Sequence, residues 1–145
     1  MSDQRSADRL PDEAADRIAL QDVMLNYAAG IDERDFELYR SCFADAVEVL
    51  GFGPTPIHGV DVWLDFVKNA LDRFGSTQHM LGPQLATVDG DTAHTRSDLQ
   101  ALHVLKEPEG ETYILWATYE TDMARIDGAW KITRHRLVSR GSKRG

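Results

Sequence analysis

The hydrophobic pattern of this 145-residue chain changes its period once, near Gly75, and this change limits the folds open to it. Before Gly75, apolar residues recur at the three- and four-residue steps of amphipathic helices. After Gly75 come four long runs rich in β-branched and aromatic residues, separated by DGD, EPEG and DG, which are typical of hairpin turns. We therefore expect one α+β domain, in which helices pack against one face of a curved sheet.

Turn and cap residues set the expected boundaries of the elements. Pro11, Asp12 and Glu13 suit the first turn of a helix, whereas GFGPTP and Gly75 are expected to end regular structure. The helices are expected at residues 11–30, 35–43 and 59–74, with a strand at 46–50. The later strands are expected at 77–88, 92–105, 111–126 and 129–140, in a domain of 11–140 between a flexible tail at 1–10 and a basic tail at 141–145.

Composition excludes several classes of protein. The net charge of −8 and the lack of a dominant basic patch argue against a nucleic-acid partner, and the basic cluster at 140–144 is interpreted as solvated. No apolar run approaches the roughly 20 residues of a membrane span, and the first residues lack the apolar core of a secretory signal. Cys42 is the one cysteine, so no internal disulfide forms and a cytoplasmic location is expected.

The first helix places an acid where its apolar face ends. Its apolar residues lead through Tyr27 to Gly30 and then to Asp32. Asp32 could be a solvated helix end, but we interpret it as a carboxylate that faces a cavity and orients His79, in STQHML, as a base. The alternative for His79 is an ordinary core or surface histidine. Tyr27 and Asp32 lie roughly 140° apart around a helix, so both can face the cavity only if the helix ends or turns near Gly30.

Several segments carry a resemblance to a known family: ALQDVMLNYAAGIDERDFELYRSCFAD, IHGVDVWLDFV, TQHMLGP, VDGDTAHTRSDLQALHV and DGAWKITRHRL. Over about residues 14–140 the chain resembles the SnoaL-like division of the NTF2-like superfamily. That superfamily includes polyketide cyclases, scytalone dehydratase, ketosteroid isomerase, limonene epoxide hydrolase, a hexachlorocyclohexane dehydrochlorinase and a bile-acid 7α-dehydratase. The resemblance implies a cone-shaped, curved mixed or antiparallel sheet closed by three N-terminal helices, and a homodimer or higher homo-oligomer joined by the outer face of the sheet.

The resemblance also implies catalytic residues. The dehydratase and dehydrochlorinase branch uses an aspartate after the first helix and a histidine on the strand after the third, which correspond to Asp32 and His79. Tyr27 matches a tyrosine five residues ahead of that aspartate. Gly82-Pro83 stands where an asparagine is common, and this departure puts the substrate of any single family member in doubt.

Substrate-binding residues follow from the same branch. A second acid on its long central strand corresponds to Asp98, in RSDL. A basic residue on its last strand falls near His135, with Arg134 or Arg136 as alternatives if a bulge shifts the register.

Other chemistries have less support in the sequence. Cys42 has no adjacent base, and no glycine-rich phosphate loop is present. No metal or other cofactor is expected, because the five histidines are too scattered for a ligand motif. The tryptophans are expected in the core: Trp63, Trp116 and Trp130.

We therefore expect a cofactor-independent lyase or isomerase that acts on a hydrophobic, steroid- or polyketide-like cyclic molecule. Removal of a proton from carbon needs a base that titrates near neutrality, which imidazole provides. Dehydration is the favoured reaction, and isomerisation or cyclisation would use the same base. The alternative is a module without catalysis that binds a small ligand or serves in assembly, as does the small subunit of ring-hydroxylating dioxygenases.

Overall fold

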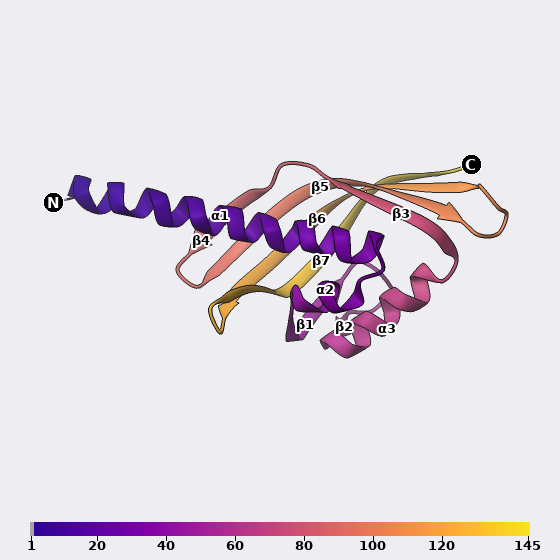
Figure 1. Ribbon diagram of the computed structural model, residues 1–145, viewed down its shortest axis with the longest axis horizontal. Helices are drawn as coiled ribbons and strands as arrows, with labels where there is room; N and C mark the ends of the chain where they lie inside the picture. The colour runs from indigo at the N-terminus through magenta and orange to yellow at the C-terminus, as the bar shows by residue number, and fades with distance from the viewer. Residues whose placement is uncertain (1) are drawn as a thin grey trace.

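The computed structural model describes the backbone of residues 2–145 and the side chains of residues 12–145. Three helices and seven strands follow one another along this part of the chain (Figure 1). The helices are α1 (Ser2–Asp32), α2 (Phe36–Ser41) and α3 (Val60–Leu71). The strands are β1 (Phe43–Leu50), β2 (Ile57–His58), β3 (Phe74–Leu81), β4 (Leu85–Asp89), β5 (Thr92–Leu105), β6 (Thr112–Ile126) and β7 (Ala129–Arg144). The predicted α+β class is confirmed.

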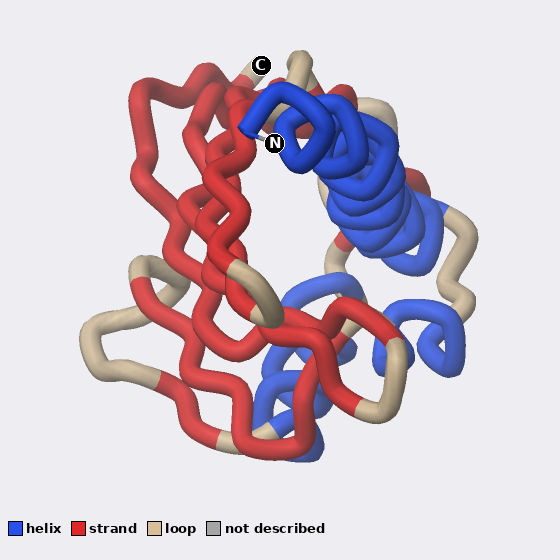
Figure 2. The backbone as a smooth tube through the Cα atoms, turned by 90° about the vertical axis from the view of Figure 1, so that its left-hand side faces the viewer, coloured by secondary structure: helices blue, strands red, loops and turns tan. Residues whose placement is uncertain are grey.

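The strands form one curved, mixed sheet that bends around the helices (Figure 2). Its order is β2-β1-β7-β6-β5-β3, and β4 pairs with β5 beyond the end of β3. The pairing of β1 with β7 is parallel, and the other pairings are antiparallel. The helices all lie on the inner side of the bend, so the predicted placement of helices against one face is also confirmed.

The helices keep their predicted order, but their ends differ from expectation. The first helix starts at Ser2 rather than Pro11 and continues through Gly30 to Asp32. The side chains of residues 1–11 lie outside the described residues, and the flexibility of residues 1–10 stays a prediction. Asp35 precedes α2 as its N-cap, accepting a hydrogen bond from the Leu38 amide at 3.0 Å.

The strand expected at 77–88 is two strands, β3 and β4. The Gly82 amide still donates to the Asp98 carbonyl oxygen at 2.7 Å, in register with the pairing of β3 and β5, but Pro83 has no N–H to donate. The sheet ladder therefore breaks at Gly82-Pro83 and resumes at Leu85. The last strand is longer than predicted: β7 pairs with β6 as far as Arg144, so the expected basic tail is largely strand.

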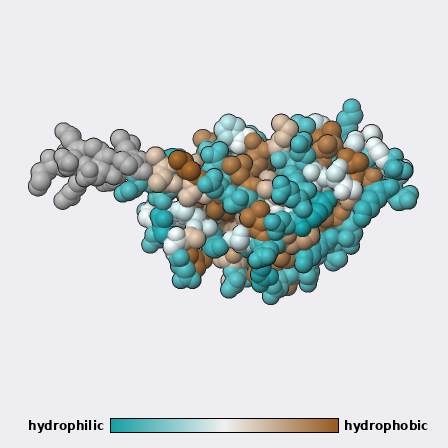
Figure 3. All heavy atoms as spheres, viewed as in Figure 1, coloured by the Kyte–Doolittle hydropathy of each residue, from teal (hydrophilic) through white to brown (hydrophobic). Residues whose placement is uncertain are grey.

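The core lies between the helices and the inner face of the sheet. Leu20, Met24 and Tyr27 of α1 and Trp63 of α3 are at most 2% exposed. Trp130 is also buried, whereas Trp116 is 39% exposed on the outer face, so the prediction of a core position was wrong for Trp116. The helical side of the molecule is largely hydrophilic, with hydrophobic residues scattered over it (Figure 3). Within the described residues, no helix has the length and hydropathy of a membrane span.

We predict that Gly30→Ala destabilises the protein although alanine favours helices. A Cβ atom at Gly30 would lie 2.9 Å from the Cα and N atoms of Tyr39, because α1 and α2 cross there without a gap. Backbone atoms cannot move aside cheaply, so we expect a loss of about 1–3 kcal/mol in the free energy of unfolding, measured by urea denaturation. The control is Gly53→Ala, where the added Cβ has nothing within 4 Å. An unchanged stability of Gly30→Ala would contradict this account.

Candidate active site

A cavity of about 280 Å³ lies between the helices and the inner face of the sheet. Most of its wall is apolar and includes Phe66, Val67, Leu99 and Leu115. The polar side chains in the wall are Tyr27, Tyr39, Arg73, His79, His103, Tyr113 and Tyr119. An apolar hollow with a few polar groups suits an apolar small molecule that is held in one orientation.

The structure brings Asp32 and His79 into contact. Asp32 ends α1 and His79 lies on β3, where its Nδ1 donates to Asp32 Oδ1 at 2.8 Å and its backbone N–H donates to Oδ2 at 2.7 Å. The side chain of His79 is 8% exposed and that of Asp32 is 20% exposed. Because the carboxylate accepts from Nδ1, the Nε2 atom keeps its lone pair, as a general base requires. His79 is in the cavity wall, so Nε2 is the ring nitrogen left for a ligand.

Tyr27 and Asp32 do not face the same space. The helix neither ends nor turns at Gly30, so the condition for both residues to face the cavity is not met, and the expectation that Asp32 faces it was wrong. Tyr27 lines the cavity, whereas Asp32 faces β3 and reaches the cavity only through His79. The carboxylate therefore acts on the imidazole and does not touch a ligand.

Two residues that the sequence analysis missed hold the Asp32 carboxylate. Thr77 Oγ1 donates to Asp32 Oδ1 at 3.0 Å and accepts from Arg34 Nη1 at 2.9 Å. Arg34 sits just past the helix with a φ of 57°, which turns its side chain back over the helix end to the Ile31 carbonyl oxygen. Thr77 could have been found, because residues two apart on a strand share a face and His79 lies two residues later.

These hydrogen bonds decide the charge of Asp32. Burial alone would raise the pKa of its carboxyl group. The hydrogen bonds from the His79 ring and backbone and from Thr77, together with the charge of His79, outweigh burial, so the pKa is lowered from its ordinary value. The carboxylate is therefore ionised at neutral pH.

For three tyrosines of the wall, the effect of burial on the pKa is not outweighed by other contacts. Burial raises the pKa of Tyr27, Tyr39 and Tyr119 well above the ordinary value, so their hydroxyl groups stay protonated. Trp63 Nε1 donates to the Tyr39 hydroxyl at 3.1 Å. The cavity thus offers neutral hydroxyl groups that can donate hydrogen bonds to oxygen atoms of a ligand.

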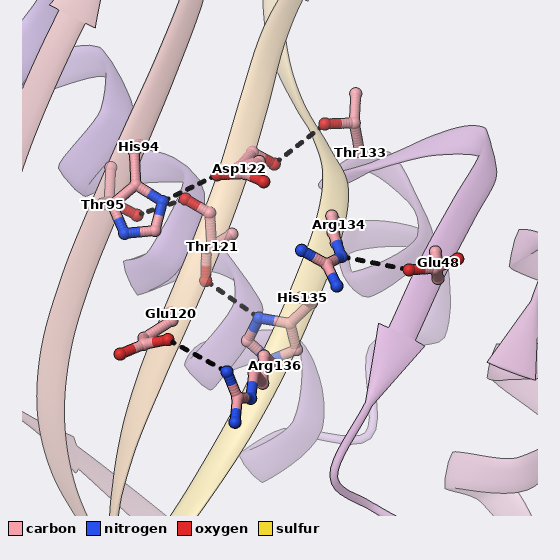
Figure 4. Close-up of polar contacts among 10 residues, drawn as sticks. All are labelled: Glu48, His94, Thr95, Glu120, Thr121, Asp122, Thr133, Arg134, His135 and Arg136. Carbon is pink, nitrogen blue, oxygen red and sulfur yellow. Dashed lines mark hydrogen bonds and ion pairs between the residues drawn. The ribbon is translucent and has the colours of Figure 1, made fainter. Parts of the chain in front are cut away.

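His135 lies behind the wall instead of in it. It is fully buried; its Nε2 is 3.0 Å from the Tyr27 hydroxyl and its Nδ1 is 2.9 Å from Thr121 Oγ1 (Figure 4). Burial lowers the pKa of His135 to about 3, so the ring is neutral. The predicted substrate-binding role is therefore not supported by its position, and His135 instead positions the hydroxyl group of Tyr27.

The other predicted substrate-binding residues point away from the cavity. Alternation along β7 turns His135 inward and its neighbours Arg134 and Arg136 outward, where they face Glu48 and Glu120 (Figure 4). The side chain of Asp98 is 67% exposed and accepts a hydrogen bond from Thr118 on the outer face of the sheet. The structure does not bring Asp98, Arg134 or Arg136 to the candidate site.

His103 is the cavity histidine that sequence reasoning did not select. Its Nδ1 donates to the Tyr113 carbonyl oxygen at 3.1 Å, and its ring lies 6.0 Å from that of His79. Burial, together with the charges of His79 and Arg73, lowers its pKa, so His103 is a neutral acceptor. The sequence indicated only weakly that His103 faces the cavity, because His103 lies on β5 where the strict alternation of buried and exposed residues ends.

Among the described residues, no cluster of three histidine, cysteine or carboxylate side chains is arranged to hold a metal ion. The expectation that the protein uses no cofactor stays a prediction.

We predict that Thr77→Val weakens the support of Asp32 without emptying the site. Valine keeps the volume but leaves Asp32 and Arg34 without the shared hydroxyl. We expect the pKa of Asp32 to rise and the free energy of unfolding to fall by about 1–3 kcal/mol. Carbon-detected NMR titration of the carboxyl groups and urea denaturation measure the two effects. The exposed Thr87→Val is the control, and an unshifted Asp32 pKa in Thr77→Val would speak against the role of the hydroxyl group.

Proteins of known sequence include relatives of this chain. The uncharacterized protein Rv2910c of Mycobacterium tuberculosis is 30% identical over 126 residues, which cover 84% of each chain. The uncharacterized protein Mb2934c of Mycobacterium bovis matches with the same identity and coverage.

Solved structures share the fold. A hexachlorocyclohexane dehydrochlorinase, LinA type 2, superimposes with a TM-score of 0.84 at 24% identity, over 92% of this chain and 91% of its own. A Novosphingobium aromaticivorans protein whose scytalone dehydratase name is provisional gives 0.83 at 22% identity, over 90% and 88% of the chains. A Nostoc punctiforme protein of unknown function with a cystatin-like fold gives 0.73 at 19% identity, over 88% and 92%. These identities establish the fold alone.

A family model with the description "SnoaL-like domain" matches residues 12–136, which is most of the chain and includes all of the cavity-lining residues except Leu137. Together with the relatives and the cystatin-like, NTF2-like architecture, this match confirms the predicted resemblance: the chain belongs to the SnoaL-like family.

Proposed function

We propose that this protein is a cofactor-independent lyase or isomerase, and that its reaction is the dehydration of a hydrophobic cyclic molecule. The observation that carries the proposal is the contact of 2.8 Å between Asp32 and His79, which leaves His79 Nε2 free in the cavity wall. Fold neighbours that are named as a dehydrochlorinase and provisionally as a dehydratase support an elimination reaction.

Each step of the elimination has a candidate residue. His79 Nε2 takes a proton from a carbon atom of the ligand, and Asp32 stabilises the imidazolium that results. The electron pair of the broken C–H bond forms a C=C bond as the neighbouring C–O bond breaks. The Tyr27 hydroxyl, positioned by His135, gives its proton to the departing oxygen, which leaves as water. Tyr27 then takes a proton from solvent and His79 releases its proton to solvent, so the net change is the loss of one water molecule.

Isomerisation and cyclisation begin with the same proton transfer but continue differently. Isomerisation returns the proton to another carbon atom, and cyclisation joins the deprotonated carbon to a carbonyl carbon of the same molecule. The proposal is tested by incubating the protein with hydroxylated steroids and polyketide-like alcohols and following the products by mass spectrometry. Loss of water that disappears in His79→Gln supports dehydration. A product of unchanged mass with a moved double bond or a new ring would replace dehydration by isomerisation or cyclisation.

The opposite outcome is a protein that binds such compounds and converts none of them. It would favour the module without catalysis, provided that binding persists in folded His79→Gln. The predicted assembly through the outer face of the sheet also stays a prediction, to be measured by analytical ultracentrifugation.

A further inference from the structure

Arg73 stands at the mouth of the cavity. It lies in the short connection from α3 to β3, elements that Figure 1 shows side by side, and it lines a hollow together with residues from the C-terminal end of β7. Its side chain lines the main cavity and also an adjoining hollow of about 340 Å³, whose wall includes Ser142 and Arg144. Phe74 and Tyr113 line both spaces as well, so the two spaces adjoin at these three residues.

The guanidinium group of Arg73 lies over an aromatic ring and has no acidic partner among the described side chains. It lies 5.1 Å from the centre of the Phe74 ring, and the Arg73 carbonyl oxygen accepts a hydrogen bond from the Lys106 amide at 3.0 Å. Among the side chains that the structure describes, no carboxylate lies within 4.0 Å of this guanidinium. Arg144 beside it differs, because it is paired with Glu111.

The charge of Arg73 acts on the cavity interior. It contributes to the lowered pKa of His103, after burial and the neighbouring His79. The protein as a whole carries a net charge of −8, so the unpaired Arg73 cation at the mouth is opposite in sign to the protein's net charge. A mouth with one sign of charge and apolar walls concentrates ligands of the opposite charge.

Aromatic rings connect this charge to the base. The Phe74 and His103 rings are 4.7 Å apart, and the His103 and His79 rings are 6.0 Å apart. Three successive intervals of 5.1, 4.7 and 6.0 Å therefore lead from the Arg73 guanidinium through the Phe74 and His103 rings to the His79 ring. That separation suits a ligand whose anionic group is separated from the reacting carbon by an apolar ring or chain.

We infer that the ligand of this cavity is an apolar anion, whose ring or chain fills the hollow while a carboxylate, sulfate or phosphate group pairs with Arg73 at the mouth. The inference deepens the proposed function and rests on it in one respect, that this cavity is the ligand site. Neutral hydrophobic molecules of the same shape bind more weakly, because they leave the guanidinium group unpaired.

The test uses two fluorescent probes with the same aromatic body, anilinonaphthalene sulfonate, which is anionic, and N-phenylnaphthylamine, which is neutral. We expect Arg73→Gln to weaken the anionic probe about tenfold, which corresponds to about 1.4 kcal/mol, and to leave the neutral probe within about twofold. Arg96→Gln, on the outer face and paired with Asp98, is the matched control and should change neither probe. Added salt should weaken only the anionic probe.

A blocking variant confirms that the probes occupy the cavity. Ala70 lines the wall from α3, and Ala70→Trp should weaken both probes. Any of three results would overturn the inference. Arg73→Gln could leave the ratio of the two probe affinities unchanged, Ala70→Trp could leave binding of the anionic probe unaffected, or the anionic probe could fail to bind at all. Both probes should still bind His79→Gln. If the protein prefers the anionic probe but converts no compound, the proposed lyase activity is wrong and the inference of an anionic ligand stands. If it converts neutral compounds alone, the proposed activity stands and the inference is wrong.

Discussion

Replacing His79 with glutamine should lower kcat by about 10²–10⁴-fold on any compound that the protein converts. Glutamine retains similar length and can keep a hydrogen bond to Asp32, but its amide cannot accept a proton near neutral pH. The chemical step loses its base while the cavity keeps its shape. Steady-state kinetics measure the effect, which should appear in kcat with little change in KM, and probe binding confirms that the variant is folded.

Asp32→Asn separates the base from the group that orients it. The amide can donate to His79 Nδ1 and so favour the tautomer with its proton on Nε2, which is the wrong one for proton abstraction. We expect a loss similar in size to that of His79→Gln, and little further loss when the two variants are combined, since both remove one function. If the losses of kcat in the two single variants add up in the double variant, the two residues act separately. This result would contradict the proposal that they act as a dyad.

Lowering the pH should destabilise the protein chiefly through His135. The folded ring stays neutral down to a pKa of about 3, whereas an unfolded chain takes up a proton near the ordinary value of 6.5. Below pH 6.5 the unfolded state binds more protons, so the free energy of unfolding falls as the pH falls, until the folded pKa is reached. At about 1.4 kcal/mol for each pKa unit, this window amounts to about 5 kcal/mol, which is comparable with the whole stability of many domains.

His135→Gln isolates this effect. At neutral pH the variant should be less stable than the natural protein by about 1–3 kcal/mol, because the contacts with Tyr27 and Thr121 are disturbed. The difference should shrink as the pH decreases, since glutamine does not titrate. Urea denaturation followed by tryptophan fluorescence measures it, with the exposed His58→Gln as the control. Parallel curves for His135→Gln and the natural protein would show that the imidazole is not held neutral by burial.

The pairing of Asp32 with His79 was predictable because the helix and the strand that carry these residues were predictable. A helix with one apolar face and a strand with a central histidine are strong local patterns, and the family resemblance supplied their tertiary relation. Local patterns do not show which way a strand residue points when the strand is interrupted. The direction of Asp98 depends on the alternation along β5. The direction of His135 depends on the alternation that resumes in β7 after Thr133, an extra residue opposite Asp122 and Met123 of β6.

The groups that support the site were harder to find from the sequence. Arg34 reaches Thr77 only because Arg34 itself adopts a left-handed backbone conformation after α1. The segment DERD does not predict that conformation. Arg73 is an ordinary charged residue in a loop until the neighbouring strands place it at a cavity mouth. Such roles depend on contacts between residues far apart in the chain, which periodicity cannot reveal.

The second hydrogen bond of Asp32 has a consequence for solubility. β3 is at the end of the main strand order, and the His79 amide, which could pair with a strand of another molecule, is capped by Asp32 Oδ2. The acid that orients the base thus also shields an open sheet margin from self-association. Variants that remove its side chain, such as Asp32→Ala, should therefore be prone to form β-rich aggregates, even where catalysis plays no part in the measurement.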